Sequence, residues 1–248
     1  MSIIGTSPDK TVSMKNIKHD AYDALLKKYV DKNGDVDYSG WKKNDVDTLS
    51  DYLESLSAAD PEKPASKENT LAFWINAYNA LTIYGILEKY PTSSIRNHTS
   101  KLFGYNIWKD LQLKVDEDAY SLDEIEHDIL RKMDEARIHY AIVCAAKSCP
   151  RLLNEAFTGD KLEQQLVKNA KHFFAQDGNF QIDENRGRVK LSSILKWFGE
   201  DFGETESELL ETIQPYISEE SAEMLNSTNT WKVSYLSYNW KLNDQKSK

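Results

Sequence analysis

The chain has 248 residues, of which 40% are hydrophobic and 29% are charged, and its formal net charge is −9. These values are typical of a soluble globular protein with one large domain or two small ones. An acidic surface repels phosphate groups, so nucleic acid and anionic lipid are disfavoured as partners, and no apolar segment is long enough for a membrane span.

The N-terminal residues 1–14 (MSIIGTSPDKTVSM) predict a flexible arm that precedes a single α+β domain over residues 15–248. The arm lacks the basic start and the long apolar run of a signal peptide. We therefore expect a cytoplasmic protein, or an exported one whose signal peptide has already been removed. Two cysteines do not distinguish these compartments.

Two amphipathic helices are predicted near the N-terminus. Residues 15–30 carry apolar side chains at helical spacing, and residues 44–57 repeat that pattern. The two prolines in residues 58–66 indicate a linker. Between the helices, acidic and amide residues alternate as in the first half of a calcium-binding loop. The sixth and twelfth positions of that loop hold Val36 and Lys42 instead of glycine and glutamate, so a plain turn is favoured over a calcium site.

The most apolar segment, LAFWINAYNALTIYGIL, lies within residues 67–89 and predicts a helix that ends before Pro91. Because its apolar residues occupy nearly every face, the helix is expected to be central and buried. Asn76 and Asn79 lie inside it, about one turn apart. A buried amide needs hydrogen-bond partners, so these side chains either hold neighbouring backbone or line a polar pocket.

Residues 107–115 and 119–122 predict a β-hairpin, and the helix that follows begins with a capping box formed by Ser121 and Glu124. At 100° per residue, Glu126 lies at the edge of the apolar stripe of this helix and can point partly inward. His127 lies on roughly the opposite side, where it faces water unless another element packs over it. An inward carboxylate needs a partner or a raised pKa.

Residues Ile138–Val143 are apolar on both sides of the alternation except at His139, which indicates a central strand. The fold class is thus predicted to be α+β, with a mostly antiparallel sheet packed on the buried central helix and further helices at the periphery. The remaining predicted elements are a helix over 162–175, a hairpin of 180–182 with 189–191, helices over 192–202 and 206–225, and a final strand over 231–243.

Both cysteines, Cys144 and Cys149, follow the predicted strand. Lys147 and Arg151 make the surroundings of Cys149 electropositive, which lowers a thiol pKa and favours a nucleophilic thiolate. His127 or His139 would be the base. Glu126, or an asparagine of the buried helix, would orient the imidazole, as the third group of a catalytic triad does.

Three alternatives to thiol catalysis remain open. The four residues between Cys144 and Cys149 permit a disulfide. A metal site made of Cys149, His139, His127 and Glu126 lacks a recognised ligand motif, so no metal is expected. The thiols could also be inert and buried. No phosphate-binding loop, dinucleotide fingerprint or serine nucleophile motif is present, so no cofactor is expected.

Five ordered motifs resemble the domain-of-unknown-function 547 family (DUF547), and the resemblance extends from about residue 20 to the end. They are FWINAYNAL (Phe73–Leu81), SLDEIEHDILR (Ser121–Arg131), RIHYAIVCAAKSCP (Arg137–Pro150), VKLSSILKWFGEDFG (Val189–Gly203) and YLSYNWKLN (Tyr235–Asn243). The family occurs in bacteria, often as secreted or periplasmic proteins, and in plants. Its pattern is carried here by Trp74, Asn76, Asn79, Glu126, His127, His139, Cys144 and Cys149. Val143 and Arg151 depart from it.

The gathering of polar and ionisable residues on buried segments favours an enzyme over an interaction module. The expected activity is a thiol-dependent hydrolase or acyltransferase acting on an amide or ester bond of a small-molecule or peptide substrate. Cys149 is the expected nucleophile, and the pocket is expected to include Asn76, Asn79, Cys144 and Arg151.

A fold similar to the papain or transglutaminase group is expected by analogy. In those enzymes the cysteine precedes its histidine, whereas here both candidate histidines precede Cys149. The alternative function is a non-catalytic binding or scaffold module with a Cys144–Cys149 disulfide.

Overall fold

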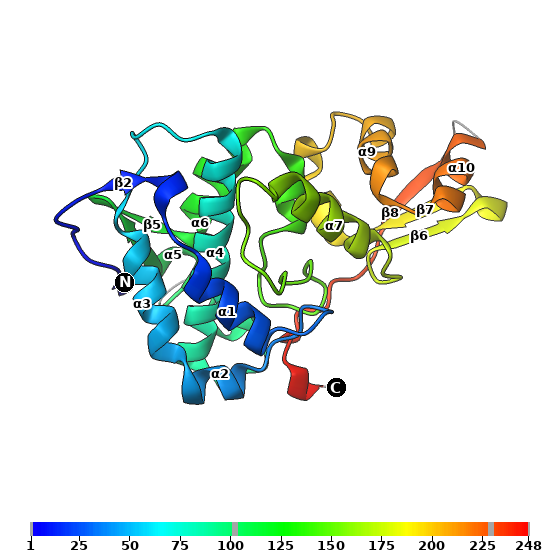
Figure 1. The fold of residues 1–248 in the computed structure, drawn as a ribbon. Coiled ribbons are helices and arrows are strands. Elements are labelled where there is room, and N and C mark those ends of the chain that lie inside the picture. Colours follow the sequence, from blue (N-terminus) through cyan, green and yellow to red (C-terminus); the bar gives the residue numbers. More distant parts are fainter. Residues whose placement is uncertain (1, 101–103, 228–230, 248) are drawn as a thin grey trace.

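The computed structural model describes residues 2–100, 104–227 and 231–247, and its central element is helix α4 (Lys67–Lys89) (Figure 1). The helix has the predicted bounds. Ser66 caps its N-terminus by accepting a hydrogen bond from the backbone N–H of Asn69, and Pro91 follows its C-terminus. The residues from Leu71 to Leu87 are almost all buried, as expected for a helix that is apolar on every face.

Three helices of the N-terminal part pack around the lower half of α4 (Figure 1): α1 (Asp20–Tyr29), α2 (Tyr38–Asn44) and α3 (Val46–Leu56). The two predicted helices are confirmed as α1 and α3, in shorter form, whereas α2 was not predicted. In the turn between α1 and α2, Asp31 Oδ1 accepts the backbone N–H groups of Asn33 and Asp35, and Lys147 Nζ lies 2.7 Å from Asp35 Oδ1.

The strands form three small sheets. The first has the order β1-β4-β5, where β1 is Ser2–Ile4, β4 is Leu111–Val115 and β5 is Asp118–Ser121. The β4–β5 pair is antiparallel and confirms the first hairpin, which the short helix α5 (Ile107–Asp110) precedes. In the second sheet β2 (Val12–Ser13) runs parallel to β3 (Ala59–Asp60). Two short pieces of the expected N-terminal arm are thus paired with the body, at β1 and β2.

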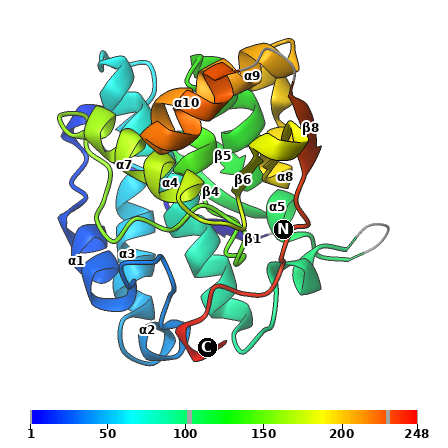
Figure 2. The same cartoon turned by 90° about the vertical axis from the view of Figure 1, so that its right-hand side faces the viewer.

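The C-terminal part builds a second hydrophobic core around the third sheet (Figures 1 and 2). Its antiparallel pair β6–β7 confirms the second hairpin, and β8 runs parallel to β7. The predicted helix 206–225 is broken near Pro215, because proline lacks the N–H that a continuous helix needs. The elements are α7 (Leu162–Phe174), β6 (Phe180–Asp183), β7 (Arg188–Leu191), α8 (Ser193–Trp197), α9 (Glu206–Ile213), α10 (Glu219–Ser227) and β8 (Lys232–Tyr235).

The α+β class is confirmed, but two details of the prediction are wrong. The single, mostly antiparallel sheet is replaced by three small sheets, each of which contains a parallel pair. The predicted strand 231–243 ends at Tyr235, after which the chain runs back across the molecule (red in Figure 2) without a helix or strand until a short 3₁₀ helix at Gln245–Ser247. This run brings residues of the last motif beside the cysteine loop, where Leu242 bridges to Ala146.

The predicted central strand Ile138–Val143 is also wrong. A 3₁₀ helix covers Ala136–Tyr140, and the cysteine loop begins directly after it. A short apolar run does not distinguish a buried strand from another buried conformation. Its backbone still needs partners, and Asn79 provides them: its Nδ2 donates to the carbonyl of Ala141, and its Oδ1 accepts the N–H of Val143, both at 2.9 Å.

The helix predicted after the first hairpin is irregular. The capping box of Ser121 and Glu124 is confirmed and starts α6 (Leu122–Glu124). A π-helical segment over Ile125–Ile129 follows, and then a 3₁₀ segment over Leu130–Met133. The N–H of Leu130 reaches the carbonyls of both Ile125 and Glu126, so one turn is widened where the EIEH motif lies.

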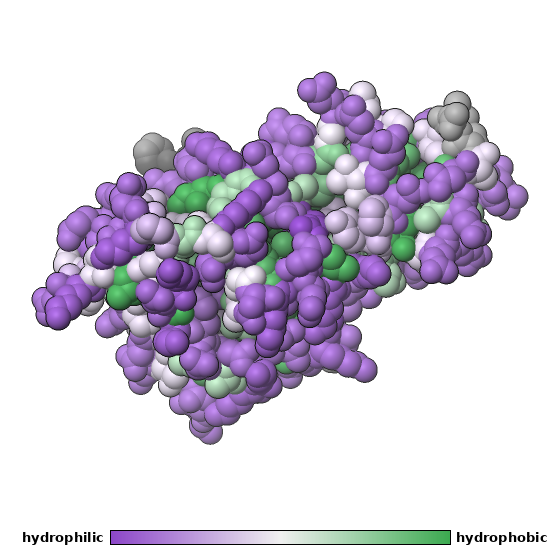
Figure 3. Space-filling view, turned by 45° about the horizontal axis from the view of Figure 1, so that its top comes forward, coloured by the Kyte–Doolittle hydropathy of each residue, from purple (hydrophilic) through white to green (hydrophobic). Residues whose placement is uncertain are grey.

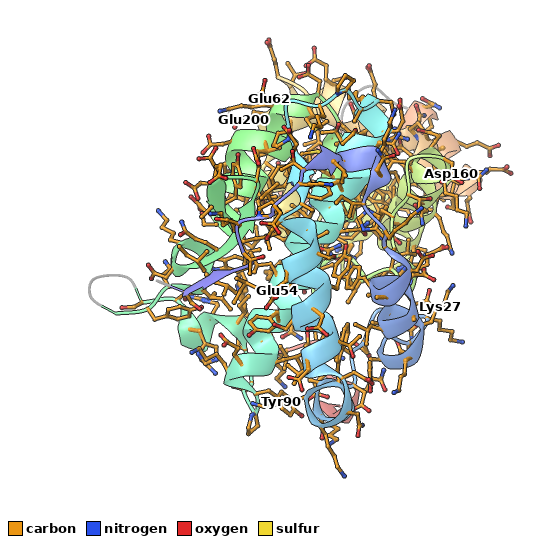
Figure 4. The ribbon with its side chains drawn as sticks, turned by 60° about the vertical axis from the view of Figure 1, so that its left-hand side comes forward. Lys27, Glu54, Glu62, Tyr90, Asp160 and Glu200 are labelled. Carbon is orange, nitrogen blue, oxygen red and sulfur yellow. A yellow bond between two sulfur atoms is a disulfide. The ribbon has the colours of Figure 1, made fainter. Side chains whose placement is uncertain are left out.

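Hydrophilic residues cover most of the face seen in Figure 3, with apolar residues between them in small patches. Lys27 and Glu54 are among the labelled charged residues that project from the N-terminal helices in Figure 4. In the described part of the chain, no helix combines the length and the apolar character that crossing a membrane requires.

Candidate functional site: a cavity at the cysteine loop

A cavity of about 220 Å³ lies beside the cysteine loop, and five of the predicted site residues line it. These residues are Glu126, His127, His139, Cys144 and Cys149. They come from the π-helical segment, the 3₁₀ helix and the cysteine loop, which are separated along the sequence. Aromatic side chains form much of the remaining wall: Tyr78, Trp108, Trp197, Phe198, Tyr238 and Trp240. His127 and Trp197 are exposed, so the cavity opens to solvent.

The two cysteines form a disulfide, with their Cα atoms 6.2 Å apart. The backbone N–H of Cys144 donates a hydrogen bond to Sγ of Cys149 at 2.9 Å. The hydroxyl of Tyr238 lies 3.1 Å from each sulfur and donates to that of Cys149. Sγ of Cys149 therefore accepts two hydrogen bonds, one from the N–H of Cys144 and one from the hydroxyl of Tyr238.

Glu126 is held by α4. The hydroxyl of Tyr78 donates to its Oε2 at 2.9 Å. Burial raises the pKa of Glu126 above its usual value, and this effect exceeds the opposing influences of the Tyr78 hydrogen bond and the nearby His127 and Arg131. The carboxyl group thus retains a proton to higher pH than a carboxyl on the surface.

His127 lies at the rim of the cavity, with 41% of its side chain exposed. Its Nε2 is 4.0 Å from Oδ1 of Asp123, and its Nδ1 is 3.1 Å from Nη1 of Arg131. A π segment turns less per residue than an α-helix, so consecutive side chains diverge less in direction. This smaller angle lets Glu126, predicted at the edge of the apolar stripe, and His127, predicted to face water, line one cavity, with His127 at its exposed rim.

His139 is buried and stacks on Phe198, with ring centroids 4.2 Å apart. Its Nε2 lies 2.7 Å from Oδ2 of Asp201. Because a carboxylate only accepts hydrogen bonds, Nε2 carries the proton and Nδ1 has the free lone pair. Burial lowers the pKa of His139, and this effect outweighs the opposing influence of Asp201.

Asp201 also binds Arg131 in a bidentate pair, Nε to Oδ2 at 2.7 Å and Nη2 to Oδ1 at 2.8 Å. Burial alone would raise the pKa of Asp201. The hydrogen bonds from Arg131 and His139 lower it by more than burial raises it, so the pKa lies below the usual value of an aspartate. Nη2 of Arg131 also reaches Glu200, which lies at the outer edge of the molecule in Figure 4. Asp201 therefore remains ionised and holds the His139 ring.

Three predicted pocket residues are not among those that line the cavity. Asn76 donates to the carbonyl of Phe157 and accepts its backbone N–H. Asn79 makes the same kind of pair with the carbonyl of Ala141 and the N–H of Val143. Arg151 donates to Oδ1 of Asn169 and to the carbonyl of Lys32. The buried amides thus hold two loops against α4, which was one of the two roles that the sequence left open.

The sequence did not single out Asp201, Arg131 or Tyr238. The signal that could have found Asp201 and Tyr238 is their position in the two C-terminal motifs, KWFGEDFG and YLSYNWKLN. Nothing local indicates that they meet the cysteine loop, because the contacts span 62 residues for His139 with Asp201 and 89 for Tyr238 with Cys149. Among the described residues, no three or more His, Cys, Asp or Glu side chains are grouped so that they could hold a metal ion.

Comparison with known proteins gives a family without an assigned activity. Residues 63–174 match the family model described as "Protein of unknown function, DUF547". No curated protein and no solved structure matches the chain. The matched region includes α4, the EIEH motif, His139 and both cysteines, and thus most of the cavity wall. Over residues 63–174, the chain is similar to the DUF547 family.

Proposed function

We propose that the cavity is the active site of a thiol-dependent hydrolase or acyltransferase that acts on an amide or ester bond, with Cys149 as the nucleophile once the disulfide is reduced. The observation that carries this proposal is the pair of donors at one sulfur. The N–H of Cys144 and the hydroxyl of Tyr238 both donate to Sγ of Cys149. Donors to the charged form of a thiol favour the thiolate.

The disulfide is the resting state in this proposal. A dithiol reductant supplies two electrons and two protons, the Cys144–Cys149 bond breaks, and the reductant leaves as a disulfide. The Cys149 thiol gives its proton to the imidazole, and the resulting thiolate attacks the acyl carbon and forms a thioester, while the leaving amine or alkoxide takes that proton from the imidazolium. Water, or a second nucleophile in acyl transfer, gives a proton to the imidazole, attacks the thioester and releases the thiolate.

His139 suits the role of base better than His127. Asp201 fixes its tautomer and Phe198 fixes its ring plane, whereas His127 is largely exposed and lies beside the Arg131 guanidinium. Asp201 also suits the orienting role better than Glu126, because Glu126 is bonded to Tyr78. Glu126, which its raised pKa keeps protonated to higher pH, is assigned to bind the leaving group by a hydrogen bond, while the imidazolium supplies the proton.

A matched pair of single-cysteine variants tests the proposal. Cys144→Ser keeps the backbone donor and leaves only Cys149, and Cys149→Ser leaves only Cys144. We expect iodoacetamide to label Cys149 several times faster than free cysteine at pH 6–7, and Cys144 more slowly. Reduced wild-type protein should cleave p-nitrophenyl esters, while Cys149→Ser should not. If Cys149 labels no faster than free cysteine, an activated thiolate is excluded.

The second candidate is a non-catalytic binding module, and the disulfide itself favours it. Closing a loop of this length stabilises a fold by about 2 kcal/mol in the chain-entropy model. A module of this kind would lose thermal stability on reduction and gain no esterase activity. Gain of activity with little change in the melting temperature would favour the enzyme.

A further inference from the structure

We infer that the cavity binds a cationic group, an ammonium or a guanidinium on an apolar stem, so that the substrate class is a compound or peptide with a basic side chain. This inference depends on the proposed function only where it calls the ligand a substrate. The binding itself does not require a reactive thiol.

The first support is the charge of the lining residues. The ionisable side chains around the cavity are Asp123, Glu126, His127 and His139, besides tyrosine, and no lysine or arginine is among the described residues that line it. The neighbouring Arg131 is already paired with Asp201 and Glu200. The described wall itself thus offers a cation carboxyl groups and no lysine or arginine, while the nearby guanidinium groups of Arg131 and Arg96 lie outside the lining. The net charge of −9 on the whole chain adds a favourable long-range field.

The second support is the aromatic side of the cavity. The rings of Trp197, Tyr238 and Trp240 contact one another, with centroids 4.6–5.8 Å apart. Trp197 is 47% exposed, which is unusual for so large an apolar side chain, and a ligand at the cavity mouth would cover it. Aromatic faces attract cations, and the guanidinium of Arg96 already lies 5.2 Å from the ring centre of Trp240.

The size of the cavity limits the ligand to a single side chain and its nearest backbone. Its volume of about 220 Å³ corresponds to roughly seven water molecules. A lysine or arginine side chain can place its methylenes against the tryptophan rings and its charged end towards Asp123. A neutral side chain of the same length gains only the apolar contacts, and an acidic one is repelled by the carboxylate of Asp123.

The test is a binding titration of the oxidised protein, followed by tryptophan fluorescence. The probes are N-acetyl-lysine amide, its neutral counterpart N-acetyl-norleucine amide, and N-acetyl-glutamate amide. We expect the lysine probe to bind about tenfold tighter than the norleucine probe, because one partly screened charge pair contributes about that much affinity. This preference should decrease as salt is added. The glutamate probe should bind most weakly.

Two variants and one control locate the site. Asp123→Asn should abolish the preference for lysine over norleucine, and Trp197→Ala should weaken both probes. Asp128→Asn is the matched control, since Asp128 lies on the same segment, pairs with Lys132 and does not line the cavity. Equal binding of the lysine and norleucine probes, no binding at millimolar concentration, or a preference that survives in Asp123→Asn would each overturn the inference. Because the disulfide is intact throughout, these outcomes are independent of the alkylation test.

Discussion

Nε2 of His139 lies 2.7 Å from Oδ2 of Asp201, and this contact joins the segment before the cysteine loop to the short helical turn after α8. Arg131, four residues after His127, binds both oxygens of the same carboxylate. Three segments that are separated along the chain therefore meet at one carboxylate, which makes Asp201 a positioning residue for the imidazole.

Replacing Asp201 with asparagine should lower the pKa of His139 further, because both the charge of the carboxylate and its hydrogen bond raise that pKa in the native protein. The imidazole proton resonances, followed by NMR during a pH titration, report this shift directly. Glu200→Gln is the matched control, since Glu200 is exposed and bonds to Arg131 but not to His139. An unchanged His139 titration in Asp201→Asn would argue against the positioning role.

Removing the hydroxyl of Tyr238 should make the reduced Cys149 thiol less acidic, because that hydroxyl donates to the sulfur. A hydrogen bond to a charged group contributes about 1.5–3 kcal/mol, so alkylation at neutral pH should slow by roughly tenfold in Tyr238→Phe. The rate is measured against pH in the Cys144→Ser background. Tyr235→Phe, which changes a tyrosine outside the cavity, should leave the profile unchanged. Coinciding profiles for the Tyr238 and Tyr235 variants would remove Tyr238 from the proposed mechanism.

Elements set by local pattern were predicted from the sequence. Helix α4 was predicted with its full bounds, because a long apolar segment and a following proline are both local features. The capping box at Ser121 and the two hairpins are local in the same sense. The membership of Glu126, both histidines and both cysteines in one site was proposed from the convergence of the motifs, and the cavity brings them together.

The remaining features depend on contacts across the chain. The exposure of His127 agrees with the helical phase, but the π-helical turn at Ile125–Ile129 is not encoded in a period of 100° per residue. The segment Ile138–Val143 avoids a strand because Asn79, 64 residues before Val143, satisfies its backbone. Asp201 and Tyr238 reach the site through the fold of the second core, which no short motif encodes.

Asn79→Ala should destabilise the fold by about 2–4 kcal/mol, because it leaves the buried carbonyl of Ala141 and the N–H of Val143 without their partner. Urea unfolding monitored by circular dichroism measures this loss. Asn97→Ala is the control, since Asn97 is exposed and its side chain donates to the hydroxyls of Thr92 and Ser93 in the neighbouring loop, and it should cost less than about 0.5 kcal/mol. Similar losses in the two variants would mean that Asn79 does not support the cysteine loop in the way described.

Acid should weaken the fold through His19, a histidine outside the cavity. Burial lowers its pKa to about 4, while Nδ1 lies 2.8 Å from the hydroxyl of Tyr52. Below pH 6.5, His19 binds a proton in the unfolded chain but stays neutral in the folded protein. The free energy of unfolding that His19 contributes above pH 6.5 is therefore lost as the pH falls towards 4. The loss from this group is about 3 kcal/mol. His19→Gln, which cannot protonate, should flatten the dependence of the urea midpoint on pH between 7 and 4, whereas His98→Gln, nearer the surface, should change it less. A slope that is the same in wild type and His19→Gln would assign the acid sensitivity to other groups.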